Sequence, residues 1–195
     1  MRRGPAVSAT AAALLCVALS ACSRLAEEVN PPTCDPDESA NVLLLIAQAV
    51  PSASQVPCIA SMPVGWDLDE MRMRSSEVIL AFNTDRNGSR VLIMELRESC
   101  DPGDAEEVFS DEPAAQRFEL VTQLTPRYVG KRFYTFEGGC LTLTFDVGGE
   151  DRGAVAAEAA TALTLFPRDL GNEELCRFSE GRISLLPDTC EGVEV

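Results

Sequence analysis

The chain has 195 residues, with 16 basic against 31 acidic side chains, a formal net charge of −15, and no histidine. Without histidine there is no Ser-His-Asp or Cys-His catalysis, no histidine-ligated metal and no histidine pH switch. The negative charge argues against nucleic acid as a partner, because phosphate binding needs clustered Lys and Arg. The length fits one domain of roughly 150 residues plus an appendage.

The first 21 residues predict a signal peptide. Arg2 and Arg3 precede an uncharged stretch from Ala6 to Ala21 whose side chains are apolar or small. This stretch is shorter than the about 20 apolar residues that a membrane span needs, and it fits the apolar core of a secretory signal peptide. We therefore expect export of the chain.

The stretch ends in Leu19-Ser20-Ala21-Cys22, which resembles the lipobox of bacterial lipoproteins. The resemblance implies a lipoprotein signal peptide over residues 1–21 and acyl chains, such as palmitate, linked to Cys22. Fifteen of the 16 basic residues are Arg, which indicates a GC-rich, actinobacterium-like source. The alternative is a plain secreted protein in which Cys22 joins a disulfide.

Lipidation predicts the location of the protein. Acyl chains on Cys22 would hold the chain at the lipid bilayer, on the outer, extracytoplasmic face of the cytoplasmic membrane. After loss of the signal peptide, 14 basic residues remain against 31 acidic ones, a net charge of −17. Anionic headgroups would repel such a domain, so the lipid has to anchor it. We expect an acidic, Pro-containing tether over 22–38 and a single domain over 39–195.

The cysteines predict a disulfide framework. Cys16 lies in the signal peptide and Cys22 would carry lipid, which leaves six cysteines, an even number that is typical of an exported domain. Six cysteines allow 15 pairings. The sequence contains no C-x-x-C motif and no histidine, so a metal or redox site has no support. We expect nearest neighbours to pair: Cys34–Cys58, Cys100–Cys140 and Cys176–Cys190.

A helix and a β-hairpin are expected in the first half of the domain. The apolar run that ends at Val50 predicts a buried helix over 39–50, which Pro51 ends. Residues 76–83 and 90–97 are apolar on both faces and are joined by a turn that contains Asn87-Gly88. This pattern predicts a hairpin of central strands covered on each side. Before it, Pro63-Val64-Gly65-Trp66 resembles the entry of PsbP-like domains over about ten residues, and no function is carried over from that resemblance.

The second half adds strands and a second helix. Leu141, Leu143 and Phe145 alternate with threonines, which is the period of a strand with one buried face. The fold class expected is α+β, an antiparallel sheet of about four to six strands with an N-terminal and a C-terminal helix packed on it. The further elements predicted are a strand over 117–123, a hairpin of 131–136 and 139–147, an Ala-rich helix over 150–166, a short helix over 173–178 and an edge strand over 182–186.

An acidic segment, residues 98–115, is the candidate cation site. Clustered carboxylates are the ligands that Ca²⁺ prefers, although the spacing does not match the calcium loop of EF-hands. A solvated acidic loop is the alternative. The candidate calcium ligands are Asp101, Asp104, Glu106 and Glu107.

Aromatic and basic residues supply the candidate binding surface. Tyr and Trp are enriched at binding surfaces, and Arg127, Lys131 and Arg132 form the densest positive cluster of the chain. Core packing of the aromatic side chains and pairing of the basic ones with nearby carboxylates are the alternatives. The candidate binding residues are Trp66, Tyr128, Arg127, Lys131 and Arg132.

No catalytic motif occurs in the sequence, and no cofactor is expected. The sequence favours a non-enzymatic binding or accessory module of the cell envelope. The lipid bilayer is the expected partner, an envelope protein is a candidate partner, and no nucleic acid is expected. One alternative is a carrier of a lipid or small apolar ligand, which needs a cavity of several hundred Å³. Another is a hydrolase that uses two carboxylates with perturbed pKa values in place of histidine.

Overall fold

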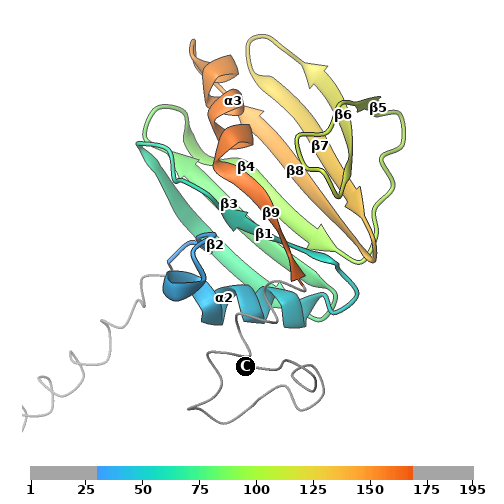
Figure 1. Ribbon diagram of the computed structural model, residues 1–195. Coiled ribbons are helices and arrows are strands. Elements are labelled where there is room, and N and C mark those ends of the chain that lie inside the picture. The colour runs from blue at the N-terminus through green and yellow to red at the C-terminus, as the bar shows by residue number, and fades with distance from the viewer. Residues whose placement is uncertain (1–29, 169–195) are drawn as a thin grey trace, which may run out of the picture.

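A seven-stranded antiparallel sheet is the main layer of the fold (Figure 1). It is seen in a computed structural model, which describes residues 30–168. The strands lie in the order β2-β3-β4-β8-β7-β6-β5. Their bounds are Trp66–Arg74 (β2), Glu77–Thr84 (β3), Gly88–Arg97 (β4), Glu106–Val108 (β5), Gln116–Gln123 (β6), Tyr128–Phe136 (β7) and Gly139–Val147 (β8).

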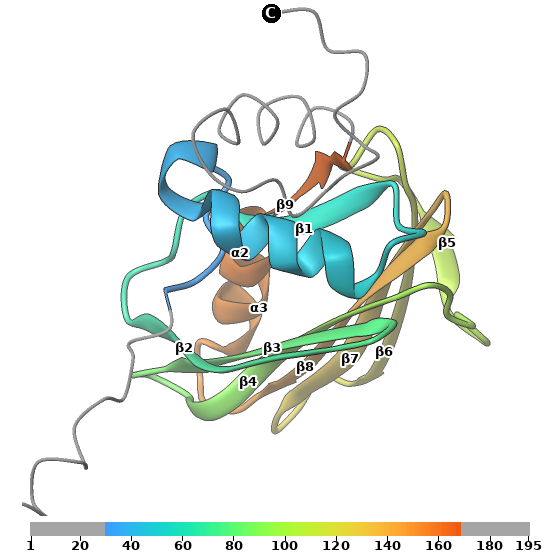
Figure 2. The same ribbon diagram turned by 90° about the horizontal axis from the view of Figure 1, so that it is seen from below.

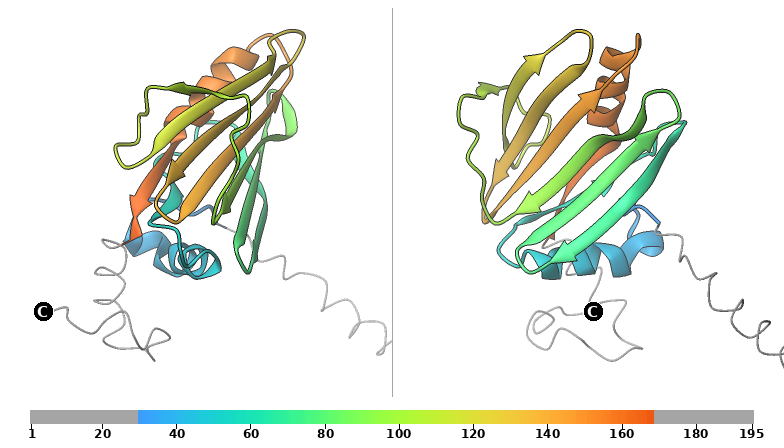
Figure 3. Two further views of the ribbon diagram at one scale, coloured as in Figure 1. Left: turned by 90° about the vertical axis from the view of Figure 1, so that its right-hand side faces the viewer. Right: turned by 180° about the vertical axis from the view of Figure 1, so that it is seen from behind.

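A second layer covers one face of this sheet. It consists of helices α2 (Pro36–Ala49) and α3 (Arg152–Ala162) and a two-stranded antiparallel ribbon of β1 (Gln55–Ile59) and β9 (Leu163–Pro167). Figure 2 shows these elements on the same side of the sheet, and in Figure 3 (right), seen from the opposite side, the strands lie in front of α3. We call the covered side the inner face and the opposite side the outer face.

The inner face of β3, β4 and β8 forms the core with the second layer. Aliphatic and aromatic side chains face one another across these strands, at the spacing of two that a strand imposes. Burial of each such side chain contributes about 1.5–3 kcal/mol. Ile46 and Val50 of the α2 region and Val155 of α3 belong to the same core and come from the second layer. The buried sheet residues are Val78, Leu80, Phe82, Leu92, Met94, Leu96, Leu141, Leu143 and Phe145.

The two predicted hairpins are present. β3 and β4 are joined by a turn in which Gly88 has a φ of 96° and the Asn87 N–H donates to the Thr84 hydroxyl at 2.9 Å. β7 and β8 form the second hairpin, with Gly138 at a φ of 65° in its turn. Positive φ is the conformation that glycine adopts at least cost, which is why both turns contain one.

The prediction that β3 and β4 are covered on both faces is wrong. The second layer lies on the inner face only (Figure 2), and Ile79 and Ile93 on the outer face are partly exposed. Arg72 and Glu95 are paired with Ile79 from the two neighbouring strands. Long charged side chains can shield apolar neighbours with their stems, which explains how aliphatic residues are tolerated there.

The antiparallel sheet and the two helices agree with the predicted α+β class, but the strand count differs. The structure has seven strands in one sheet and two in another, against about four to six expected. β2 was not predicted because five of its nine residues are charged, and β5 falls in the predicted acidic loop. α3 ends at Ala162, earlier than expected, because Leu163–Pro167 pairs with β1 from Ile59 to Gln55.

Two of the three predicted disulfides lie within the described residues, and both are confirmed. Cys34–Cys58 joins the segment before α2 to β1, and Cys100–Cys140 joins the segment after β4 to the start of β8. Each closes a loop of the size that typically contributes about 2–4 kcal/mol. Cys176 and Cys190 lie outside the described residues, as do the predicted helix over 173–178 and strand over 182–186.

The segment before α2 is part of the fold. Ile59 donates its N–H to the Pro32 carbonyl at 2.7 Å, and Cys34 donates to the Ile59 carbonyl at 3.1 Å. This pairing lies inside the stretch that the sequence assigns to the tether. Between residues 30 and 168, neither helix has the length and apolar character needed to cross a membrane.

Candidate functional site: a charged cluster on the inner face

The inner face of the sheet changes character across its width. Leu143 of β8 faces Arg132 of β7, and Arg132 faces Glu119 of β6. One pair further along, Leu141 faces Tyr134, which faces Arg117. The apolar face of β8 therefore gives way, within one strand, to ionised groups. In Figure 1, β9 and α3 lie toward the β8 side, and β5 and β6 lie beyond them.

These polar side chains bind one another. Glu119 accepts hydrogen bonds on one carboxylate oxygen, Oε1, from Nη2 of Arg117 at 2.5 Å and from Nε of Arg132 at 2.7 Å. Nη1 of Arg117 lies 3.2 Å from Oδ1 of Asp111, and the Tyr134 hydroxyl donates to the same oxygen at 3.0 Å. We call Arg117, Glu119, Arg132, Tyr134 and Asp111 the inner-face cluster. It connects three segments of the chain through two shared acceptors.

The cluster is deeper than ordinary surface ion pairs. The side chain of Arg132 is 11% exposed, that of Arg117 is 18% exposed and that of Glu119 is 28% exposed. The guanidinium of Arg132 lies over the ring of Phe145, 5.9 Å from its centroid, where a cation is attracted to the ring. By contrast, Arg97 on the outer face is 52% exposed.

Arg132 also carries an unused donor. Its Nη1 atom is buried and has no hydrogen-bond acceptor. Leaving a buried donor unsatisfied costs about 1–3 kcal/mol, and more for a charged group. In the described chain one other buried side-chain nitrogen is in this state, Nε of Arg72, but that atom lies 3.5 Å from the Glu70 carboxylate. The inner-face cluster is therefore the site where an added acceptor would gain most.

Ionisation in the cluster is fixed at neutral pH. Burial raises the pKa of Tyr134 to about 12, and burial also raises the pKa of Tyr128. Burial by itself would raise the pKa of Glu119, but hydrogen bonds and charges from Arg117 and Arg132 lower it overall. The tyrosines thus remain donors and Glu119 remains ionised. This arrangement suits recognition of a ligand through fixed donors and an ionised acceptor.

The structure separates the predicted binding residues. Tyr128 and Arg132 share the inner face, and Tyr128 makes an edge-to-face contact with Phe145 at 5.9 Å. Lys131 is exposed on the outer face, because neighbouring residues of a strand point to opposite sides. Arg127 pairs with Asp146 at 2.6 Å on the surface. Trp66 is buried in the core, and its indole donates to Glu158 at 3.3 Å.

Only Arg132 of the cluster is among the binding residues predicted from the sequence, and four members are not: Arg117, Glu119, Tyr134 and Asp111. Arg117 and Glu119 are two apart in a predicted strand, which places them on one face. That spacing was a usable indication. Their contact with Arg132 depends on the register in which β6 pairs with β7. The contact of Asp111 with Tyr134 depends on the course of the loop between β5 and β6. Neither is specified by local sequence.

The candidate calcium ligands do not form a site in the described residues. Asp101, Asp104, Glu106 and Glu107 are exposed. Asp101 instead accepts the N–H of Gly103 at 2.9 Å in a local turn. Within residues 30–168, no three acidic or cysteine side chains are grouped so that they could hold a metal ion.

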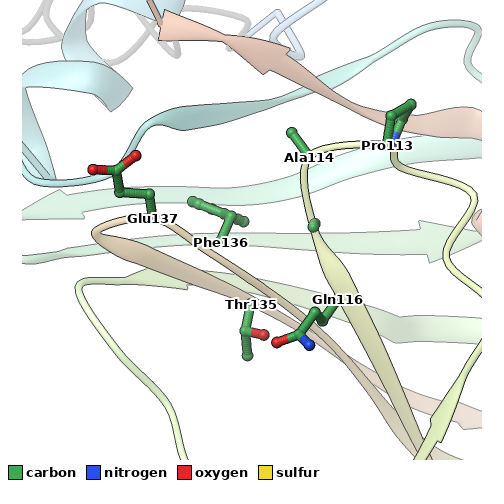
Figure 4. Close-up of a pocket in the computed structure, with 7 residues that line it drawn as sticks. Pro113, Ala114, Gln116, Thr135, Phe136 and Glu137 are labelled. Atoms are coloured by element: carbon green, nitrogen blue, oxygen red, sulfur yellow. The ribbon is translucent and has the colours of Figure 1, made fainter.

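Two hollows flank the loop between β5 and β6. Figure 4 shows the larger, of about 480 Å³, between Pro113–Gln116 and the β7–β8 turn, with Thr135, Phe136 and Glu137 on its far side. The smaller, of about 140 Å³, lies between the same loop and the β1–β9 ribbon and is lined by Leu165 and Pro167. The larger hollow has the volume that a small ligand requires, but polar groups make up much of its lining.

The comparisons with known proteins give no match. No protein-family model, no curated protein and no solved structure matches the chain. The case for a function therefore rests on the chain's own residues.

Four carboxyl groups of the described residues have a shifted pKa. A glycosidase-type hydrolase needs one carboxyl group with a raised pKa. Each described carboxyl whose pKa departs from its ordinary value has it lowered, by an arginine or another hydrogen-bond donor. These groups are Glu70, Glu119, Asp151 and Glu158.

Proposed function

We propose that the chain is a lipid-anchored, non-enzymatic binding module of the cell envelope. Its ligand, a small molecule or a group of a partner protein, supplies a hydrogen-bond acceptor to the inner-face cluster. The single observation that carries this proposal is the buried Nη1 of Arg132, a charged donor without an acceptor. An acceptor there would recover the about 1–3 kcal/mol that the unsatisfied group costs.

The neighbouring groups favour an oxygen acceptor. Arg132 and Arg117 bring two positive charges to one side of Glu119, and both bind the same Oε1 atom. Hydrogen bonds from a guanidinium to a carboxylate or phosphate oxygen are stronger than those to neutral groups. Glu119 and Asp111 balance these two positive charges, so the class of ligand that the cluster fits is one that presents an oxygen acceptor to Nη1 of Arg132.

The cellular location of the module is inferred from the N-terminal sequence. The lipobox Leu19-Ser20-Ala21-Cys22 supports anchoring through acylated Cys22 at the outer face of the cytoplasmic membrane, and two disulfides are in keeping with an oxidising compartment. The net charge of −17 after processing would keep the domain away from anionic headgroups. The module would then meet its ligand outside the membrane surface.

A carrier of an apolar ligand is the second candidate, because the hollow of about 480 Å³ has the necessary volume. Gln116, Thr135 and Glu137 in its lining favour the binding-module proposal instead. A carboxylate hydrolase is the third candidate. It would require a carboxyl group with a raised pKa.

The test is purification of the full chain from its native membrane in mild detergent, followed by native mass spectrometry. We expect an acylated chain that retains a stoichiometric ligand. Arg132→Gln should lose this ligand, and Lys131→Gln, a change of the next residue on the opposite face, should keep it. Retention of an apolar molecule by both variants would favour the carrier, and turnover of a glycoside or ester substrate would favour the hydrolase. An unacylated chain would contradict the proposed anchoring.

A further inference from the structure

The loop between β5 and β6 spans two parts of the fold. We call its residues 109–115 the strap. Asp111 of the strap contacts the inner-face cluster on β6 and β7. Glu112, the next residue, accepts the N–H of Leu165 in β9 at 3.2 Å. The strap therefore joins the inner-face cluster to the β1–β9 ribbon.

The strap has little packing of its own. None of its residues is buried, and Ala115 is the one that packs against the core. The hollows of about 480 Å³ and about 140 Å³ lie on its two sides. Figure 4 shows Ala114 of the strap and Phe136 of β7 on opposite sides of the larger hollow. Segments with few buried apolar contacts open at a low cost in free energy. The carboxylates of Asp111 and Glu112 are thus the main ties of the strap to the rest of the fold.

Asp111 occupies a position that suits a carboxylate ligand. Its Oδ1 atom accepts from the Tyr134 hydroxyl at 3.0 Å and lies 3.2 Å from Nη1 of Arg117. Charge-assisted bonds of this kind are the ones by which proteins recognise carboxylates. The Asp111 side chain is 48% exposed, so a molecule in solution can reach this position. The strap therefore places a carboxylate of the chain itself where a ligand carboxylate would bind.

This resident carboxylate leaves one donor unused. Burial raises the pKa of Tyr134 to about 12, and Arg132 opposes part of this rise, which places the Arg132 guanidinium beside the phenol oxygen. Nη1 of Arg132 nevertheless has no acceptor. A free carboxylate is not tied to the strap, so its two oxygens can serve Arg117, Tyr134 and Arg132 together. It would also replace Asp111 charge for charge, which keeps the cluster balanced.

We propose that the strap is an autoinhibitory contact, in which Asp111 holds the place of a ligand carboxylate. The ligand displaces Asp111 from Arg117 and Tyr134, accepts a hydrogen bond from Nη1 of Arg132 and thereby releases the strap. This inference rests on the proposed ligand site, and it adds the class of the ligand and the group that the ligand displaces.

The experiment titrates acetate into the isotope-labelled full chain in nanodiscs of neutral phosphatidylcholine, at constant ionic strength. A proton–nitrogen correlation spectrum reports the Nε–H groups of Arg117 and Arg132 and the backbone amide of Leu165. We expect saturable shifts of both arginine signals. Bound acetate should also speed the exchange of the Leu165 amide with water, because the strap is then released. Acetamide has the same shape without the charge and should cause neither change.

Two strap variants and a matched control make the test specific. Asp111→Ala removes the competing carboxylate and should strengthen acetate binding about tenfold, because every molecule then has a free site. Glu112→Ala unties the strap from β9 without touching the cluster and should strengthen binding by a smaller factor. Glu107→Ala makes the same change of charge on β5. Glu107 pairs with Phe118, whose neighbours on either side face inward, so it lies on the outer face. Acetate affinity should change there by less than about twofold.

Several results would overturn the inference. One is equal acetate affinity of the wild type, Asp111→Ala and Glu107→Ala, and another is the absence of acetate binding in all of them. Shifts of Arg132 without faster exchange at Leu165 would show that a ligand binds while the strap stays in place, which leaves the proposed function intact. Acetate binding that Arg132→Gln does not change would contradict the ligand site at Arg132 and with it this inference.

Discussion

The inner face of the sheet consists of two halves that use the same backbone differently. Over β3, β4 and β8 it is aliphatic and is sealed by α2, α3 and the β1–β9 ribbon. Over β6 and β7 it carries Arg117, Glu119 and Arg132, which are partly buried and bind one another. Burial of the first half stabilises the fold. The second half costs desolvation of three charges and leaves one donor without a partner, so stability alone does not account for it.

The position of the boundary strengthens this contrast. Leu143 is fully buried and faces Arg132 directly across one strand pair. Phe145 belongs to both halves, since it lies in the core and supports the Arg132 guanidinium and the Tyr128 ring. The apolar half thus acts as a rigid platform for the charged half. Sites built on strands hold their side chains more firmly than sites on loops.

The largest expected effect tests the apolar half. Leu143→Ala should lower the free energy of unfolding by about 2–5 kcal/mol, because it leaves a cavity in a packed core. Thr144→Ala, one residue further and on the outer face, should change it by less than about 1 kcal/mol. Urea unfolding followed by circular dichroism measures both. Similar losses in the two variants would show that the two faces of β8 do not differ as described.

The next effect tests the charged half. Glu119→Gln keeps the shape of the side chain but removes the charge that Arg117 and Arg132 share. We expect a loss of about 1–3 kcal/mol in the free energy of unfolding, because the partly buried guanidinium of Arg132 then lacks a counter-charge and that of Arg117 keeps only Asp111. The control is Glu107→Gln in the neighbouring strand, whose side chain is exposed and should cost less than about 0.5 kcal/mol. Equal effects would place Glu119 among ordinary surface acids.

A pH series sharpens the same comparison. The pKa of Glu119 is lowered in the folded chain by Arg117 and Arg132, so its contribution is fully present above its unfolded pKa of about 4.3. The contribution is lost as the pH falls through the lowered folded value. The gap in unfolding free energy between wild type and Glu119→Gln should therefore be constant near neutrality and close below about pH 4. A gap that widens on acidification would contradict this assignment.

The smallest stability effect is expected at Arg132 itself. Arg132→Met removes the unsatisfied Nη1 and still leaves Glu119 paired with Arg117, and methionine packs well against Phe145. We expect the free energy of unfolding to change by less than about 1 kcal/mol, in either direction. Urea unfolding measures this beside Glu119→Gln. A loss of several kcal/mol would mean that Arg132 is retained to stabilise the fold.

Much of the fold follows from local sequence, and the exceptions have physical causes. Asn87-Gly88 predicts a hairpin because both residues tolerate positive φ, and nearest-neighbour pairing predicts the two described disulfides. β2 escapes prediction because an edge strand carries charges that resemble a loop. β9 escapes because Leu163–Pro167 continues an apolar helical pattern, and its strand form depends on pairing with β1, about 100 residues earlier in the chain.

The candidate site was only half predictable. Tyr128 and Arg132 were singled out because of their residue types, and both lie on the inner face. Their neighbours Lys131 and Arg127 were grouped with them because they are close in sequence. Successive side chains of a strand point to opposite faces, so closeness in sequence does not place them together. Glu119 and Asp111 join the cluster only through sheet register and the path of the β5–β6 loop. Contacts between distant segments carry that information, and composition does not.

A high-resolution crystal structure of the protein purified from its native membrane tests the central claim most directly. The account predicts density for a bound ligand with an oxygen atom within hydrogen-bond distance of Nη1 of Arg132. A lone ordered water in that position, or a protein group that accepts from Nη1, would contradict it, because the donor would then be satisfied without a ligand.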